Sequence, residues 1–378
     1  MDFSSFTQTP LLVLLNILVM LYFFVLIRPA LKNYGNIPND WIVLAKFLII
    51  LFCLFSFWGV DWFHYAQIFA KIKKYGGTHM EDVYVSIAQF SPNYLVFRFI
   101  IWGSAVFLVF DFFKRINVNY VLALLIFSAT SLIWFSYARV SLAMALMFWG
   151  VSVVFNPLYG KKLLSYVVGI SAIVASFYFH KTAAFGIGII GIAFLANKLK
   201  GRSILILSAL LIPIEFLLIQ HYLLDFMLVD ARVEEGAWGS SIASGQHYLG
   251  KETVTSGIGS NIAKFLELLP YYLTAYCCLK LSGKKHLFEM IPISVKAFVY
   301  IAFYFVLFAS IFAFDFGYST EILYGRFMRF AFLPCVVVVS YCYEIVETHK
   351  IAKYIVYLGM ASTMYQLLYV LYCTFTKL

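Results

Sequence analysis

Long apolar runs separated by short polar segments recur from one end of the chain to the other. A helix that crosses a bilayer needs about 20 mostly apolar residues, because the hydrocarbon core is about 30 Å thick and each residue adds about 1.5 Å. The pattern therefore predicts an all-α polytopic integral membrane protein with about 12 transmembrane helices in a single transmembrane domain, residues 1–378. The expected spans are Leu11–Ile27, Ile42–Gly59, Tyr94–Phe113, Tyr120–Tyr137, Val140–Phe155, Leu163–Phe179, Ala183–Ala196, Ser203–Ile219, Ile262–Leu281, Val295–Phe314, Phe330–Tyr343 and Tyr354–Phe375.

The charged residues between the runs predict how the chain is oriented. The protein is 63% hydrophobic and 12% charged, so its few Lys and Arg residues carry most of the orientation signal. They are scattered through one set of alternate short loops, which the positive-inside rule assigns to the cytoplasm, and they form no stripe that would suit nucleic acid. The first apolar run lacks a basic segment before it and a small-residue cleavage site, so we expect a retained helix. The expected cytoplasmic residues are Arg28, Lys32, Lys114, Arg115, Lys161, Lys162, Lys198, Lys200, Arg202, Lys280, Lys284, Lys285, Lys350 and Lys353.

Two longer segments fall on the opposite, outer side. The first, residues 60–93, begins as an amphipathic helix that continues to Tyr75 and is expected to lie in the membrane interface. The second, residues 220–260, mixes carboxylates with aromatic residues around a centre rich in Gly and Ser. A long loop in a compact membrane protein is typically a functional loop or a disordered one, and this composition suits either sugar binding or an ordinary solvated loop. The candidate acceptor-sugar residues are Tyr65, Glu81, Trp238 and Tyr248.

Two basic residues interrupt apolar runs in the middle of the chain. Arg139 joins two spans in too few residues for a free loop, and His180 ends the span after those two. Because the chain crosses the membrane and returns between them, both are expected on the outer side at a similar depth. An ionisable residue there is a functional-site candidate, since a partner must offset its desolvation. Asp61, Glu81 and Asp82 are available as partners, whereas His180 can also be an ordinary buried histidine.

Arg326 and Arg329 stand three residues apart where the outer side meets a later span, so they share a helix face. A guanidinium group grips phosphate oxygens in a bidentate fork, although snorkelling to lipid phosphates is the alternative. We predict that Arg139, Arg326 and Arg329 bind a phosphate group. His180 is predicted to accept a proton from a hydroxyl, because imidazole titrates near neutral pH, and Asp61 is the rival base.

Several chemistries find no support in the sequence. The chain has no phosphate-binding G-x-x-x-x-G-K-[ST], no HExxH, no Cys/His metal framework, no G-x-S-x-G and no D-x-D. We therefore expect metal-free, cofactor-free chemistry on a lipid-phosphate substrate at the outer face. The six Cys residues lie in or beside apolar runs and are expected to be small packing residues. They are Cys53, Cys277, Cys278, Cys335, Cys342 and Cys373.

Four short motifs occur in a fixed order, and Gly150 follows Arg139 after ten intervening residues. The motifs are Asp61-x-x-x-Tyr65, Arg139-Val140-Ser141-Leu142-Ala143, Phe179-His180-Lys181-Thr182-Ala183 and a Tyr/Arg-rich corner, Tyr324–Phe330. Together they resemble the EpsG-like family of Wzy-type polysaccharide polymerases. Val140 and Thr182 depart from the resemblance, because the family usually has Gln and Ser at these positions.

The resemblance implies an O-antigen or exopolysaccharide polymerase in the inner (cytoplasmic) membrane of a bacterium, with its active site facing the periplasm. Such an enzyme is a metal-independent glycosyltransferase of polysaccharide and lipopolysaccharide biosynthesis, with a fold similar to the GT-C glycosyltransferases. It transfers the growing glycan from undecaprenyl pyrophosphate to the next lipid-linked repeat unit. The implied partners are the undecaprenyl-pyrophosphate-linked oligosaccharide, membrane lipid and a chain-length-determining co-polymerase, and no nucleic acid.

Three other classes of protein compete with this interpretation. An O-antigen ligase shares the chemistry, and the sequence does not separate it from a polymerase. A polysaccharide flippase or another transporter predicts charged residues near the middle of the bilayer and repeat symmetry. An acyltransferase that decorates surface sugars needs a cytoplasmic entry route for its acyl donor.

Overall fold

The computed structural model describes residues 10–55, 60–76, 81–137, 140–157, 160–180, 258–313 and 321–376, and Ala183, Ser203, Leu205, Ile206, Ala209 and Leu210 between them. These residues form helices and, within the described ranges, no β-strand. Four described segments are long and apolar enough to cross a membrane, which confirms the all-α polytopic class: Leu14–Lys32, Tyr94–Arg115, Lys162–Phe179 and Ile293–Ser310.

The helices follow the predicted apolar runs, and several short elements lie between them. In chain order they are α1 (Pro10–Lys32), α2 (Asn39–Phe55), α3 (Val60–Tyr75), α4 (Asp82–Phe90), α5 (Tyr94–Arg98), the π-helix η2 (Phe99–Gly103), α6 (Ser104–Arg115), α7 (Tyr120–Thr130), α8 (Leu132–Tyr137), α9 (Ser141–Phe155), α10 (Lys162–Phe179), α15 (Ile258–Gly283), α16 (Lys285–Met290), α17 (Ile293–Ala313), α18 (Glu321–Glu344) and α19 (Val346–Thr376). Two predicted spans, Ala183–Ala196 and Ser203–Ile219, fall largely outside the described residues.

One predicted span is two helices. The run expected as Tyr120–Tyr137 breaks at Ser131, where α7 ends and α8 begins. The hydroxyl of Thr130 donates to the Ile126 carbonyl, 2.7 Å away, so it competes with the backbone for hydrogen bonds at the break. The carbonyl of Thr130, which loses its helical partner, accepts from the Thr363 hydroxyl of α19 at 3.2 Å. A break inside a membrane helix is tolerated when a neighbouring helix satisfies the freed backbone group in this way.

A second boundary also differs from the prediction. The span expected to start at Phe330 belongs to α18, which begins at Glu321. The Tyr/Arg-rich corner is therefore helical over its whole length, Tyr324–Phe330, and Arg326 and Arg329 lie within the first turns of one continuous helix.

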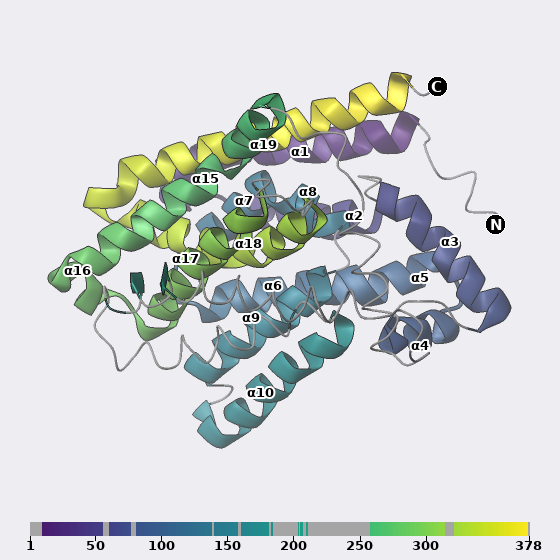
Figure 1. The fold of residues 1–378 in the computed structure, drawn as a ribbon, viewed down its shortest axis with the longest axis horizontal. Coiled ribbons are helices and arrows are strands. Elements are labelled where there is room, and N and C mark those ends of the chain that lie inside the picture. The colour runs from purple at the N-terminus through teal and green to yellow at the C-terminus, as the bar shows by residue number, and fades with distance from the viewer. Residues whose placement is uncertain are drawn as a thin grey trace.

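The long helices lie roughly along one direction (Figure 1). Helices α1 and α19 pack side by side along one edge, and α10 lies at the opposite edge against α9. Helices α3 and α4 lie at one end of the bundle and α16 lies at the other. Helices α3 and α4 therefore lie where they can shape a site at their end of the bundle.

Hydrogen bonds between distant turns define one end of the bundle, which we call the basic end. The Tyr343 hydroxyl donates to the Leu31 carbonyl at 2.6 Å, and the Asn119 side chain donates to the Tyr34 carbonyl at 2.7 Å. These bonds bring the α1–α2, α6–α7 and α18–α19 connections together. The basic residues at this end include Lys32, Lys114, Arg115, Lys161, Lys162, Lys280, Lys284, Lys285, Lys350 and Lys353.

The opposite end, which we call the His180 end, includes the C-terminal ends of α2 and α10 and the N-terminal end of α5. The Asn16 side chain donates to the Phe55 carbonyl at 3.2 Å, which joins the beginning of α1 to the end of α2. Asn93 begins α5 by accepting the Val96 amide at 3.0 Å. The described residues of the basic set that the sequence assigns to one face therefore lie together at one end of the bundle.

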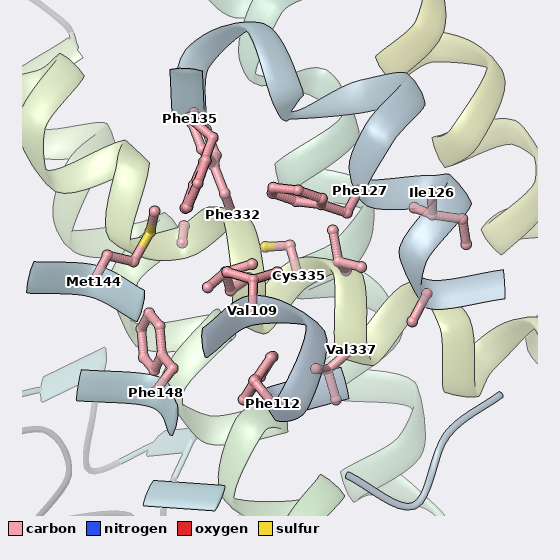
Figure 2. Packing of buried hydrophobic residues seen from close by; sticks show 14 of the residues in the cluster. Val109, Phe112, Ile126, Phe127, Phe135, Met144, Phe148, Phe332, Cys335 and Val337 are labelled. Carbon is pink, nitrogen blue, oxygen red and sulfur yellow. The ribbon is translucent and has the colours of Figure 1, made fainter. Parts of the chain in front are cut away.

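Between the two ends, side chains from α6, α7, α8, α9 and α18 interlock (Figure 2). The Phe127 ring meets the Phe135 ring edge-on, with centroids 5.2 Å apart. Phe112 and Phe148 both pack on Phe298 of α17, at 5.2 Å and 5.9 Å. Lipid is as apolar as this core, so close van der Waals packing rather than the hydrophobic effect holds it together.

The described cysteines belong to this interior. Cys53, Cys277, Cys278, Cys335 and Cys342 are buried free thiols, and the side chain of Cys373 lies outside the described residues.

Candidate active site

His180 follows the last residue of α10, where the chain leaves the helix in an extended conformation (φ −159°, ψ 121°). Its amide donates to the Ser176 carbonyl at 3.0 Å, and its own carbonyl accepts from Ala183 at 2.9 Å. The side chain is only 4% exposed. The negative end of the α10 dipole lies beside it and favours a positive charge there. The imidazole is therefore buried at a helix end that suits a proton acceptor.

Helix α4 covers this end of α10. The buried Tyr84 ring meets the Phe179 ring edge-on, with centroids 5.9 Å apart and an interplanar angle of 88°. Phe179 immediately precedes His180, so this ring contact places α4 against the C-terminal end of α10. The sequence pattern predicts an outer loop here and gives no signal that singles out Tyr84.

Glu81 stands at the start of α4. Its carbonyl accepts from the amides of Tyr84 and Val85, at 2.9 Å and 3.2 Å. Its Oε2 atom is buried. The structure therefore places a partly buried carboxyl group on the helix that covers the end of α10.

Helix α3 carries Asp61 and Tyr65, which are four residues apart and share a face. Tyr65 is buried, and its ring lies 6.1 Å from the Trp102 ring of η2. Further along α3, Phe69 packs on Tyr94 at 5.7 Å. These contacts fix α3 against α5 and η2. The side chain of Asp61 lies outside the described residues.

Hydrogen bonds join α3 to α4. The Lys73 ammonium donates to the Gln89 carbonyl at 2.6 Å, and the Gln89 side chain donates to the Gly76 carbonyl at 2.8 Å. These hydrogen bonds therefore fix α3 and α4 against each other at the His180 end. We call them the α3–α4 layer.

Arg98 is a candidate residue that the sequence-based site does not contain. It lies where α5 passes into η2 and is 1% exposed. Its Nη2 atom donates to the Cys53 carbonyl near the end of α2 at 2.6 Å, and its guanidinium carbon lies 4.6 Å from the centre of the Trp102 ring. π-helical segments occur frequently at functional sites. The sequence signal was a single charged residue one turn inside an apolar run, which is a functional candidate by default.

Arg329 lies in α18 between the buried residues Met328 and Phe330. The Arg329 side chain is partly buried, and its Nε atom is completely buried. Phe330 stacks on Phe305 of α17, with centroids 5.6 Å apart, which holds this part of α18 in place. Arg326 belongs to the same helix, and its side chain lies outside the described residues.

Three of the predicted site residues, Arg139, Trp238 and Tyr248, lie outside the described residues. The residues next to Arg139 are closely packed. The Ser141 hydroxyl donates to the Phe135 carbonyl, and both residues are buried. This bond joins the two helices on either side of Arg139.

The fold and these side chains define a multi-pass helical membrane protein with buried or partly buried His and Arg residues at one end of its bundle. The EpsG family model matches residues 39–377, nearly the whole chain. The protein therefore belongs to the EpsG family, which confirms the resemblance and gives it a polysaccharide-polymerase type of role. No curated protein and no solved structure matches the chain.

Proposed function

We propose that this protein polymerises O-antigen or exopolysaccharide at the His180 end, on the periplasmic side of a bacterial inner membrane. The donor is a glycan on undecaprenyl pyrophosphate, and the acceptor is the next lipid-linked repeat unit. The observation that carries the proposal is the buried His180 at the end of α10, at the end of the bundle where Arg98 is also buried. Family membership supports the class of reaction.

The proposed reaction is a single displacement at the anomeric carbon of the donor. The oxygen of the acceptor hydroxyl forms a bond to this carbon while the bond from the carbon to the pyrophosphate oxygen breaks. His180 accepts the hydroxyl proton, and the lipid pyrophosphate leaves with the electron pair. A general base contributes about 10²- to 10⁴-fold to the rate. Asp61 is the alternative base and otherwise orients His180 or Arg139.

Arg139, Arg326 and Arg329 bind the pyrophosphate in this proposal. Guanidinium groups offset the charge that develops as the donor bond breaks, in a setting where water is excluded. Their common helix supports this role for Arg326 and Arg329, because a spacing of three residues directs both to one face. With the charge offset by Arg residues, the reaction needs no metal ion.

Arg98 has a positioning role. Its guanidinium group already donates to Cys53 and stacks on Trp102, which in turn contacts Tyr65. It thereby joins α2, η2 and α3, the helix that carries Asp61.

The acceptor sugar is proposed to contact Tyr65 and Glu81 on the α3–α4 layer and Trp238 and Tyr248 in the segment 220–260. Aromatic rings stack on sugar rings, and a carboxylate accepts hydrogen bonds from sugar hydroxyls. Membrane lipid and a chain-length-determining co-polymerase are the other proposed partners.

The test is a gel of surface polysaccharide from a strain in which the gene is deleted, with and without the gene supplied on a plasmid. Loss of the ladder with survival of the core carrying one repeat unit supports a polymerase. Loss of all attached glycan contradicts it and indicates an O-antigen ligase or a flippase. Purified protein incubated with the lipid-linked repeat unit should lengthen the glycan, whereas a transporter would not.

A further inference from the structure

Two ammonium groups from different helices share one aromatic ring at the basic end. Lys46 of α2 places its Nζ atom 5.2 Å from the centre of the Tyr120 ring, and Lys114 of α6 places its Nζ atom 5.9 Å from the same centre. Tyr120 is the first residue of α7. A cation over an aromatic face is attracted by the ring, but two cations over one ring repel each other.

No carboxylate offsets this repulsion within the described residues, because neither Lys46 nor Lys114 forms an ion pair there. Asp111 is close to Lys114 in the sequence, but its Oδ2 atom accepts from Arg115 at 2.5 Å and from Trp149 at 2.7 Å. Asp40 is six residues before Lys46 on α2, which places it about 120° away around the helix. The positive charges of Lys46 and Lys114 are therefore not balanced by an ion pair within the described residues, which favours an anionic ligand there.

The hydroxyl of Tyr120 adds a hydrogen-bond donor. Its oxygen is buried and has no hydrogen-bond partner among the residues that the structure describes. A buried hydroxyl without a partner is unfavourable, so such a group usually marks a bound water or ligand. The ring lies at the positive N-terminal end of α7, whose field also favours an anion. The amides of Leu122 and Ala123 already donate to Asn119, so these two amides are not available to an anion.

The surface beside Lys46 is apolar. Val43, Leu44 and Phe47 of α2 are exposed, and in a membrane protein such side chains face acyl chains. Lys46 is partly buried and lies seven residues along α2 from Asn39, a distance of about 10 Å. The two ammonium groups thus lie where a lipid headgroup meets its tails.

We propose that Lys46, Lys114 and Tyr120 form a binding site for the phosphate group of an anionic phospholipid. The two ammonium groups and the hydroxyl donate to the phosphate oxygens, and the acyl chains extend past the exposed Phe47 towards the middle of the bilayer. Basic pockets between membrane helices bind phosphate headgroups in this manner. The site lies at the opposite end of the bundle from His180, and it stands whether or not the proposed polymerase activity is correct. A free phosphate ion presents the same oxygens, and the experiment separates the two sources.

The experiment is native mass spectrometry of the detergent-purified protein during titration with phosphatidylglycerol, phosphatidylcholine or inorganic phosphate. Phosphatidylglycerol should bind more tightly than phosphatidylcholine. Lys46→Gln and Lys114→Gln should each weaken phosphatidylglycerol binding about fivefold, because a Lys near an anionic membrane surface contributes about that factor. Tyr120→Phe keeps the ring and should also weaken binding. The matched control is Lys296→Gln, because the Lys296 ammonium lies over Phe288 at 4.8 Å and shares that ring with no second cation in the described part of the chain.

Each outcome decides the proposal. Binding of inorganic phosphate with the same dependence on Lys46 and Lys114, without binding of phosphatidylglycerol, keeps the phosphate site but assigns it to the free ion. Unchanged phosphatidylglycerol binding in both Lys variants, or an equal loss in Lys296→Gln, overturns the site. Elution volume and thermal stability of each variant separate weak binding from misfolding, and Tyr120→Phe provides a test that keeps the packing of the ring.

Discussion

A Cβ atom on Gly150 would lie 2.6 Å from the carbonyl oxygen of Gly169, and one on Gly169 would lie 2.7 Å from the carbonyl oxygen of Gly150. Helices α9 and α10 therefore touch backbone to backbone where they cross. Small residues allow this close approach between membrane helices. Because His180 directly follows α10, this crossing helps to set where His180 lies relative to α9.

Gly150→Val should separate α9 from α10. The added side chain has no room, because an ideal Cβ already comes within 2.9 Å of Ile173. Overpacking of this kind costs about 1–3 kcal/mol. The measurement is the apparent melting temperature of the detergent-purified protein, together with polymer synthesis in cells. The control is Ser171→Val, on the exposed side of α10, which should leave both unchanged. A Gly150→Val protein as stable as the control would contradict the close crossing.

Tyr84→Ala should remove the ring that packs on Phe179, the residue before His180. Large-to-small changes of a buried aromatic residue cost about 3–5 kcal/mol, so the end of α10 that positions His180 should loosen. We expect polymer length and yield to fall, whereas Tyr84→Phe should keep most activity because the ring contact remains. The matched control is Phe90→Ala on the same helix, because Phe90 is 89% exposed. Equal loss in both alanine variants would show that α4 acts only as a surface helix.

His180→Ala should abolish visible polymer while the protein stays in the membrane. Loss of a general base lowers the rate by about 10²- to 10⁴-fold, which is enough to remove the ladder from a gel. The control is His286→Ala, because His286 lies at the basic end with a side chain that is 67% exposed. Normal polymer in the His180→Ala strain would contradict the assignment of His180 as the base. Asp61→Asn would then be the next variant to test.

Arg98→Met should loosen the junction of α2 and α5. It leaves the Cys53 carbonyl without its guanidinium donor, and an unsatisfied buried carbonyl costs about 1–3 kcal/mol. Arg98→Lys keeps the charge but loses the planar group that stacks on Trp102, so we expect an intermediate loss. Thermal unfolding measures the structural effect. Assays over a range of acceptor concentrations should show a raised KM, because α3 carries the proposed acceptor contact Tyr65. A variant with an unchanged melting temperature and an unchanged KM would refute the positioning role.

Some details of the fold were not predictable from local patterns. The apolar run 120–137 is continuous in hydropathy, yet Ser131 interrupts the helix because Thr363, more than two hundred residues later, satisfies the freed carbonyl. Similarly, α18 begins at Glu321, well before the apolar run that predicted a span from Phe330. Both departures depend on neighbouring helices that a single apolar run does not reveal.

The residues of the candidate site were likewise predictable from the sequence only in part. The sequence alone identified His180 and Arg329 as ionisable residues at the edges of apolar runs, and the structure describes both as buried or partly buried. It did not identify Tyr84 or the anchoring of Arg98, because both depend on a partner in a distant segment. Arg98 and Cys53 are 45 residues apart, and their hydrogen bond forms only when α2 and α5 pack together.

The sequence by itself determined the membrane class, the approximate positions of the described spans and, through short motifs, the EpsG family. These properties follow from apolar run length and from a few residues in fixed order, which are local. Only the tertiary structure decided that α4 covers the end of α10, that Gly150 meets Gly169, and that Lys46 and Lys114 share one ring. The physical reason is that close packing between side chains of different helices determines which helices become neighbours in a bilayer. The apolar pattern of a single helix does not specify those neighbours.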